Sequence, residues 1–165
     1  MASSDLPSLL TFSRATTAPL MDVRVETVRE VSGELVDAFG RLLPQLSSRA
    51  KPLGFQAVQR MVACDVNTVL VARAAGVIVG TLTLVMFPVP SGLRARVEDV
   101  VVDGSARGQG VAGLLTGEAL RIAREAGART VDLTSRPDRA AANRLYERLG
   151  FRSRESTVYR VPLDE

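Results

Sequence analysis

The sequence predicts an α+β fold in which a mixed, mostly antiparallel central sheet is covered by helices on both faces. Three observations predict it. A block rich in β-branched residues occupies positions 68–103 and is interrupted only by short turns, a pattern typical of adjacent antiparallel strands. Segments with a helical spacing of apolar residues lie on both sides of this block. Glycines follow two of those helical segments, in the position where helices commonly end.

The first part of the chain is expected to contribute one strand and two helices. Residues 23–28 alternate apolar and polar side chains, which predicts a strand. Residues 30–43 carry apolar side chains at helical spacing, and Pro44 is expected to end this helix. A polar connection over 45–54 leads to a second short helix over 55–64, whose inward side chains are Val58, Met61 and Val62.

The β-branched block is expected to form three strands, over 68–73, 77–87 and 94–103. A tight turn over 74–76 joins the first two, and a Pro- and Gly-containing loop over 88–92 joins the last two. Short connections of this kind favour antiparallel neighbours. The block is therefore predicted to be an antiparallel meander.

The last third of the chain is expected to alternate helices with strands. A helix over 110–126 presents an apolar face made of Val111, Leu114, Leu115, Ala119 and Ile122. A central strand over 130–134 and a helix over 138–149 follow. Phe151 and residues 157–162 supply the final strand. The predicted order is β-α-α-β-β-β-α-β-α-β.

A chain of 165 residues has the length of one domain, which we expect over residues 20–165. Residues 1–19 are expected to be a flexible tail. They are not expected to be a signal peptide, because they lack its basic start and long apolar block. No apolar run approaches the ~20 residues of a membrane helix. The single cysteine, Cys64, is expected to be a small buried side chain. We expect a cytoplasmic protein, a monomer or homodimer, with no membrane partner.

The chain contains no histidine, which excludes Ser-His-Asp and Cys-His catalytic groups and histidine zinc sites. Acid–base chemistry must therefore use Glu, Asp, Tyr, a backbone group or water, and no metal is expected. The formal net charge is +3, but Lys51 is the only lysine, and the arginines are dispersed among carboxylates. Nucleic acid is therefore not an expected partner.

A glycine-rich loop joins the predicted strand 94–103 to the predicted helix 110–126, and it reads Arg107-Gly108-Gln109-Gly110-Val111-Ala112. The first N–H groups of a helix have no partner inside it, the helix dipole adds positive charge, and glycines let a phosphate approach the backbone. The loop therefore predicts a pyrophosphate site. Its sequence also fits the Rossmann pattern Gly-x-Gly-x-x-Gly through Gly113. That fold requires a βαβ series, however, and the strand before this loop belongs to a meander. No P-loop sequence occurs.

Two motifs together resemble those of the GNAT superfamily of N-acetyltransferases. Residues 107–112 fit the pattern [Gln/Arg]-x-x-Gly-x-[Gly/Ala], five residues after a strand that ends in the apolar Val102. Residues 142–151 resemble the second motif, Leu/Phe-Tyr-x-x-x-Gly-Phe, with Tyr146 as its tyrosine. The resemblance covers residues 68–160 well. It implies a GNAT-like sheet and acetyl-CoA as the acyl donor.

The resemblance implies a role for each matching residue. Backbone amides of residues 108–113 would hold the CoA pyrophosphate, and residues 100–102 would pair with the pantetheine arm through main-chain hydrogen bonds. Asn143 could bond the pantetheine amides, but many family members place an Asn where this chain has Arg139, so either could meet the cofactor. The cofactor-binding candidates are Val100, Val101, Val102, Arg107, Gly108, Gln109, Gly110, Val111, Ala112, Gly113 and Asn143.

Tyr146 and Glu98 are the catalytic candidates. Tyr146 matches the family tyrosine whose hydroxyl hydrogen-bonds to, or protonates, the departing CoA thiolate. The attacking amine must lose a proton, and Glu98 and Asp99 lie on the strand beside the thioester. Whether Glu98, Asp99 or a water is the base stays open, since either carboxylate could instead pair with a nearby arginine.

The implied reaction is direct attack of a primary amine on the thioester, whose carbonyl is polarised by a strand amide near Val100. No acyl-enzyme is expected. The acceptor pocket is expected from residues 45–54, residues 85–92 and the last hairpin, with Arg41, Arg49, Lys51 and Arg94 nearby. The acceptor could be a small-molecule amine or a protein N-terminus. A non-catalytic acyl-CoA or nucleotide-binding module is the alternative, although such a module has no need of Tyr146.

Overall fold

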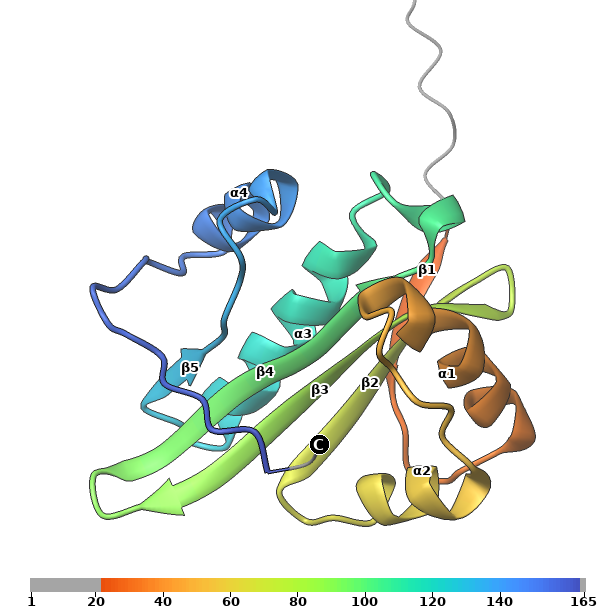
Figure 1. Ribbon diagram of the computed structural model, residues 1–165, viewed down its shortest axis with the longest axis horizontal. Coiled ribbons are helices and arrows are strands. Elements are labelled where there is room, and N and C mark those ends of the chain that lie inside the picture. Colours follow the sequence, from red (N-terminus) through yellow and green to blue (C-terminus); the bar gives the residue numbers. More distant parts are fainter. Residues whose placement is uncertain (1–21, 164–165) are drawn as a thin grey trace, which may run out of the picture.

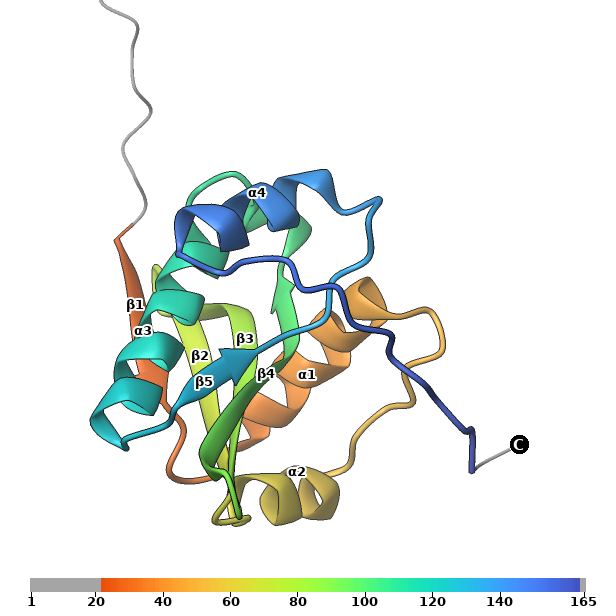
Figure 2. The ribbon, with the colours of Figure 1, turned by 90° about the vertical axis from the view of Figure 1, so that its left-hand side faces the viewer.

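The computed structural model describes residues 22–163, so the predicted tail over 1–19 lies outside the described residues. A five-stranded sheet in the order β1-β2-β3-β4-β5 forms the middle layer. Helices α1 and α2 cover one face and α3 covers the other, while α4 lies near one end of α3 (Figures 1 and 2). The elements are β1 (Val23–Thr27), α1 (Gly33–Leu46), α2 (Phe55–Val62), β2 (Asn67–Ala74), β3 (Val77–Val89), β4 (Gly92–Val102), the short 3₁₀ helix η1 (Gly104–Ala106), α3 (Val111–Glu125), β5 (Thr130–Asp132) and α4 (Ala140–Arg148).

The predicted mixed sheet is confirmed. Strands β1 to β4 are antiparallel neighbours, and β5 alone runs parallel to β4. The predicted meander of β2, β3 and β4 is therefore present. The hairpin between β3 and β4 is longer than expected, because Val89 still pairs with Gly92. The predicted loop over 88–92 is thus reduced to a two-residue turn.

Helix α1 differs from its prediction at both ends. It begins at Gly33, after Ser32, whose hydroxyl accepts a hydrogen bond from the N–H of Leu35 at 3.2 Å. Pro44 does not end it, since the helix continues to Leu46. A proline in the last turn of a helix removes a single hydrogen bond, which two further helical residues can tolerate. The N–H of Ser47 then donates to the carbonyl of Leu43 and closes the helix.

The core has two layers, one on each face of the sheet. Strand β2 shows why, because residues 69–72 are all buried and alternate between the two layers. Leu70 and Leu115 lie in the layer beneath α3, and Leu42 lies in the layer beneath α1. Helix α3 approaches β3 most closely at Gly80, where an added Cβ would lie 3.2 Å from the side chains of α3. The sheet is therefore fixed from both sides.

The prediction of a final strand is wrong within the described residues. The chain from 151 to 163 carries no strand, so the described order ends with α4. β5 has only three residues and pairs only with β4, so the alternating side chains after Thr157 have no neighbouring strand against which to be buried. Val158, Val161 and Leu163 remain largely exposed.

Two burial predictions are also wrong. Cys64 is exposed, because α2 ends at Val62 and leaves Cys64 in the connection to β2. Leu114 is 47% exposed, since the buried face of α3 passes through Val111 and Leu115. In the described part of the chain, no helix is long and apolar enough to cross a membrane.

Candidate functional site

Strand β4 carries a bulge in the segment predicted to face an acyl donor. Thr81 pairs with Val101 and Thr83 pairs with Glu98, so two residues of β4 stand opposite one residue of β3. Asp99 has φ +50°, the backbone strain expected at such a bulge. A bulge interrupts the ladder, which frees backbone N–H and C=O groups near residues 99 and 100 for other partners.

The other edge of β4 is open beyond Arg96. β5 pairs with Arg94, Ala95 and Arg96 only. Residues 97–102 therefore have β3 on one side and no described strand on the other. An exposed strand edge presents a row of unpaired N–H and C=O groups, to which an extended group with amides can pair as an added strand. The bulge and the open edge are adjacent: Val100 lies in the bulge, and Val100, Val101 and Val102 all lie on the open edge.

The β4–α3 loop (residues 103–110) leads from this edge to the start of α3. Gly108 and Gly110 have φ of +75° and +81°, a left-handed conformation that favours glycine. A Cβ built on either glycine would have no other heavy atom within 4 Å, so the space above the backbone is open. Gly110 is the N-cap of α3 and provides no side-chain cap. The first N–H groups of α3 are therefore free to bind an anion, and the residues fit a diphosphate.

The other predicted residues of this loop have distinct positions. Arg107 is exposed, and its Nε donates to the carbonyl of Val102 at 3.3 Å. Gln109 donates to the carbonyl of Ser105 at 3.4 Å. Val111 is buried, so its side chain belongs to the core and only its backbone N–H is available to a ligand. Ala112 follows it in the first turn of α3.

Gly113 brings α4 against the first turn of α3. A Cβ at Gly113 would lie 3.4 Å from Cδ1 of Leu145. Leu145 is next to Tyr146, so this contact sets the catalytic candidate beside the helix that begins at the glycine loop. Figures 1 and 2 both show α4 near this end of α3. The structure therefore brings the two sequence motifs together.

Tyr146 is half-buried and packs edge-on against Phe151, with ring centroids 5.8 Å apart. Burial raises the pKa of the Tyr146 hydroxyl, and the charge of Arg139 opposes that shift. The hydroxyl is therefore protonated at neutral pH, which is the state required to donate a hydrogen bond or a proton. Phe151, the last residue of the second motif, holds the ring from the loop after α4.

Asn143 and Arg139 occupy different positions around α4. The side-chain amide of Asn143 donates to the carbonyl of Arg136 at 3.1 Å, which fastens the loop that precedes the helix. Arg139 is the N-cap of α4 and is near enough to Tyr146 to act on its pKa. The Asn143 amide thus already has a structural partner, while Arg139 is electrostatically linked to the tyrosine.

The two carboxylate candidates also differ. The Glu98 carboxylate accepts a hydrogen bond from Nε of Arg96, whose guanidinium also donates to Thr134 at 3.3 Å. Among residues 22–163 the Asp99 carboxylate has no such ion pair, and its pKa is raised, first by desolvation and then by the charge of Glu98. A carboxylate with a raised pKa binds a proton more readily, as a general base requires. The two carboxylates therefore differ in environment: Glu98 is paired with an arginine, whereas the Asp99 carboxyl has a raised pKa.

The residues expected around an acceptor are only partly assembled. The last hairpin is not present in the described residues. Arg94 donates to Thr130 at 3.0 Å and to Ser91 at 3.3 Å, which places it near the β3–β4 turn. Arg41 donates to the carbonyl of Ile78 at 2.7 Å. These two arginines are thus engaged within the protein.

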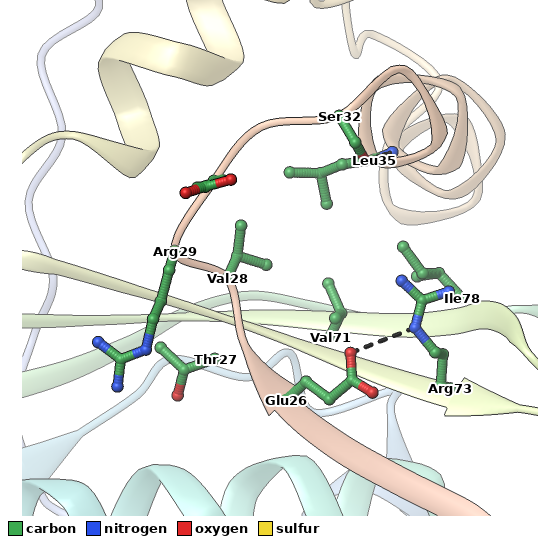
Figure 3. A pocket seen from close by; sticks show the side chains of 10 residues that line it. Glu26, Thr27, Val28, Arg29, Ser32, Leu35, Val71, Arg73 and Ile78 are labelled. Carbon is green, nitrogen blue, oxygen red and sulfur yellow. Dashed lines mark hydrogen bonds and ion pairs between the residues drawn. The ribbon is translucent and has the colours of Figure 1, made fainter.

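A separate pocket of about 170 Å³ lies between the end of β1 and the start of α1 (Figure 3). Apolar side chains such as Leu35 and Ile78 line one part of it. Arg73 lines another part and pairs with Glu26 at 3.2 Å and with Glu34 at 2.5 Å. None of the predicted site residues lines this pocket. Arg29 and Glu30 also line it, and because the pocket lies apart from both sequence motifs it is not the candidate site.

Sequence reasoning missed a group of residues that hold the β4–α3 loop. Asp103 is the N-cap of η1, and its carboxylate accepts hydrogen bonds from the N–H and hydroxyl of Ser105 at 3.0 and 2.7 Å. The Asp-x-Ser spacing is a recognisable capping pattern. No local pattern could reveal that Gln45 of α1 also contacts this loop, because 58 residues separate it from Asp103.

Comparisons with known proteins bear on the family and the fold of the chain. A family model described as "Acetyltransferase (GNAT) family" matches residues 39–151. A Trypanosoma brucei acetyltransferase structure is 28% identical with a TM-score of 0.71, over 86% of this chain and 100% of that one. A structure named a transcriptional regulator, from Bacillus halodurans, is 28% identical with a TM-score of 0.70, over 84% and 99%. AAC(6')-Iy in complex with a CoA-S-monomethyl-acetylneamine bisubstrate analogue is 19% identical with a TM-score of 0.70, over 85% and 97%. A search of curated proteins found no match.

Proposed function

Because this chain belongs to the GNAT family of acetyltransferases, we propose that it transfers the acetyl group of acetyl-CoA to a primary amine. The observation that carries the proposal is the open, bulged edge of β4 next to the uncapped glycine N-terminus of α3. The strand edge suits the amides of a pantetheine arm, and the helix N-terminus suits a diphosphate. The two surfaces are joined by the short β4–α3 loop, in the order in which CoA presents these groups.

The proposed binding residues follow from those two surfaces. Backbone groups of Val100, Val101 and Val102 pair with the pantetheine amides. Backbone N–H groups from Gly108 to Gly113 bind the diphosphate, with Arg107 at the surface to add positive charge. Because these contacts use the backbone, side-chain substitutions at the valines would test folding and not binding.

The proposed chemistry uses three groups of this chain. A backbone N–H freed by the bulge near Val100 polarises the thioester carbonyl. The Asp99 carboxylate, directly or through water, takes the proton that the amine loses on attack. The Tyr146 hydroxyl donates to the sulfur as the C–S bond breaks, so the leaving group departs as a thiol or hydrogen-bonded thiolate. The amine nitrogen gains the acetyl group directly, with no acyl-enzyme.

A small-molecule amine is the acceptor class that we favour. AAC(6')-Iy, whose structure contains a CoA-S-monomethyl-acetylneamine bisubstrate analogue, has this fold but only 19% identity, so it supports a class and not a substrate. The Asp99 carboxylate suits an amine acceptor, whereas the Glu98 carboxylate is already paired with Arg96. A second candidate function is a non-catalytic acyl-CoA-binding module. It is supported by the similar protein that is named a transcriptional regulator.

Two measurements test the proposal. Titration calorimetry with acetyl-CoA and with CoA should show saturable binding, and the melting temperature should rise with ligand concentration. A panel of amines, amino acids, aminoglycosides and amino-terminal peptides, read by release of free thiol, should then identify an acceptor. The absence of acetyl-CoA binding would overturn the proposal. Binding without thiol release for any acceptor would favour the non-catalytic module.

A further inference from the structure

The end of α1 is attached to the β4–α3 loop by the side chain of Gln45. Its Oε1 accepts a hydrogen bond from the N–H of Gly104 at 2.9 Å, and its Nε2 donates to Oδ2 of Asp103 at 3.4 Å. The same Nε2 donates to the carbonyl of Arg41, one turn earlier in α1, at 3.2 Å. One side chain thus contacts two successive residues of the loop and is oriented by its own helix.

Asp103 is held from several sides at the same point. Its backbone N–H donates to the carbonyl of Val79 in β3 at 2.8 Å. One carboxylate oxygen accepts from Ser105, and the other faces Gln45 and lies 3.9 Å from Nε of Arg41. These contacts lower the pKa of the Asp103 carboxyl, with the Ser105 hydroxyl as the largest cause. The loop therefore begins from a residue fixed to β3, to α1 and to its own first turn.

Ala106, in the middle of the loop, is fully buried in the core beneath α3, and its N–H donates to the carbonyl of Asp103 at 2.9 Å. The residues after Ala106 are held less firmly: Gly108 and Gly110 have no side chains, and within the described residues the side chains of Arg107 and Gln109 donate to the carbonyls of Val102 and Ser105. Flexible glycine backbone loses much conformational entropy when it is ordered around a ligand. The contacts at Asp103 and Gly104, together with the buried Ala106, therefore set where this glycine segment begins.

We propose that Gln45 is a positioning residue for the diphosphate site: through Asp103 and Gly104 it fixes the β4–α3 loop in its binding conformation. This inference rests on the proposed function, since it concerns the affinity for CoA. Gln45 also lies at the end of α1, where the predicted acceptor-side connection begins. We expect the loss of Gln45 to act on CoA affinity through the β4–α3 loop that it contacts.

The test is calorimetry with CoA on the wild type and on four variants. Gln45→Ala should weaken CoA binding about five- to tenfold, the effect of losing one or two hydrogen bonds that order a loop. Gln45→Glu keeps the acceptor for Gly104 but places a carboxylate against Asp103, so it should bind at least as weakly. The double variant Gln45→Glu/Asp103→Asn reverses donor and acceptor and should restore affinity. Gln56→Ala, an exposed glutamine of α2, is the matched control.

Amide hydrogen exchange provides a readout without ligand. Residues 103–110 should exchange faster in Gln45→Ala than in the wild type, with an unchanged melting temperature. CoA affinity of Gln45→Ala within twofold of the wild type would overturn the inference, as would failure of the double variant to recover. A wild type that binds no CoA would overturn the proposed function itself, and faster exchange in Gln45→Ala would still show that Gln45 orders the loop.

Discussion

Residues 23–123 and residues 124–163 are held in place in different ways. Within the described chain, every buried residue lies between Leu35 and Ala123. That part contains four antiparallel strands and the three helices that pack on them. The later part contains the three-residue strand β5 and α4, which has no buried residue. The proposed binding surfaces belong to the first part, and Tyr146 belongs to the second.

The difference separates the CoA-binding surfaces from the proposed catalytic tyrosine. A strand edge and a helix N-terminus bind through the backbone, so their geometry depends on the rigid core beneath them. Tyr146 needs only to keep its ring in place. Two contacts hold it there, that of Leu145 with Gly113 and that of Phe151 with the Tyr146 ring. Substitutions at the glycine loop should therefore change affinity, substitutions in the core should change stability, and substitutions of Tyr146 or of Asp99, which lies in the first part, should change turnover.

The largest effect is expected from Gly110→Asp. A carboxylate at the N-cap of α3 would oppose the diphosphate where free N–H groups attract it, so CoA affinity should fall at least about a hundredfold. Gly76→Asp is the matched control, since Gly76 has φ +80° and equally open space around it. Calorimetry should show wild-type affinity for the control. Equal affinity in both variants would remove the β4–α3 loop from the binding site.

Tyr146→Phe should lower kcat by about 10²-fold or more, with CoA affinity nearly unchanged. A hydrogen bond to sulfur strengthens as thiolate charge develops, and an interaction made in the transition state appears in kcat. Phe keeps the packing against Phe151, so stability should hold. Tyr159, which is 90% exposed, supplies the control variant Tyr159→Phe. Steady-state kinetics with a confirmed acceptor measures both, and unchanged turnover in Tyr146→Phe would leave it a packing residue.

Leu115→Ala should destabilise the protein by about 2–5 kcal/mol, because it leaves a cavity in the fully buried layer between α3 and the sheet. Leu163→Ala removes a side chain that is 95% exposed and should change stability by less than about 0.5 kcal/mol. Urea denaturation of both variants measures the contrast. Similar losses would show that the last segment is packed as firmly as the core.

The division between residues 23–123 and residues 124–163 also determines which elements could be predicted from the sequence. The meander and α3 were predictable because apolar periodicity reports burial on a sheet or helix face, and these elements are buried. The alternating apolar residues after Thr157 gave the same kind of signal, but the described chain after α4 forms no strand that pairs with β5. The apolar pattern also predicted that Leu114 faces inward, but in α3 its side chain is exposed.

The site was predictable in its local parts only. The glycine loop and the Tyr146 motif are short sequence patterns tied to helix ends, and the structure brings their elements together through Gly113 and Leu145. The bulge at Asp99 could not be predicted, because it depends on the register between β3 and β4. The contact of Gln45 with Gly104 joins segments 59 positions apart, so no local signal reports it.

Asp99 provides the smallest expected effect on turnover and the sharpest test of which carboxylate acts. If Asp99 is the base, Asp99→Asn should lower kcat/KM about tenfold at neutral pH, toward the low end of general base catalysis. Burial raises the Asp99 pKa, so the acid side of the wild-type pH profile should fall at a higher pH than an ordinary carboxylate would give. Asp99→Asn should remove that limb. The acceptor amine titrates identically in every variant, so it does not confuse the comparison.

Glu98→Gln separates the two carboxylates. Removing the Glu98 charge removes one cause of the raised Asp99 pKa, so the acid limb should move to lower pH while the plateau rate stays close to that of the wild type. Measurements of stability provide an independent test of the raised Asp99 pKa. A carboxyl whose pKa is higher in the folded state disfavours folding once it is ionised, so Asp99→Asn should be at least as stable as the wild type at pH 7. A larger rate loss in Glu98→Gln than in Asp99→Asn would assign the proton transfer to Glu98, despite its pairing with Arg96.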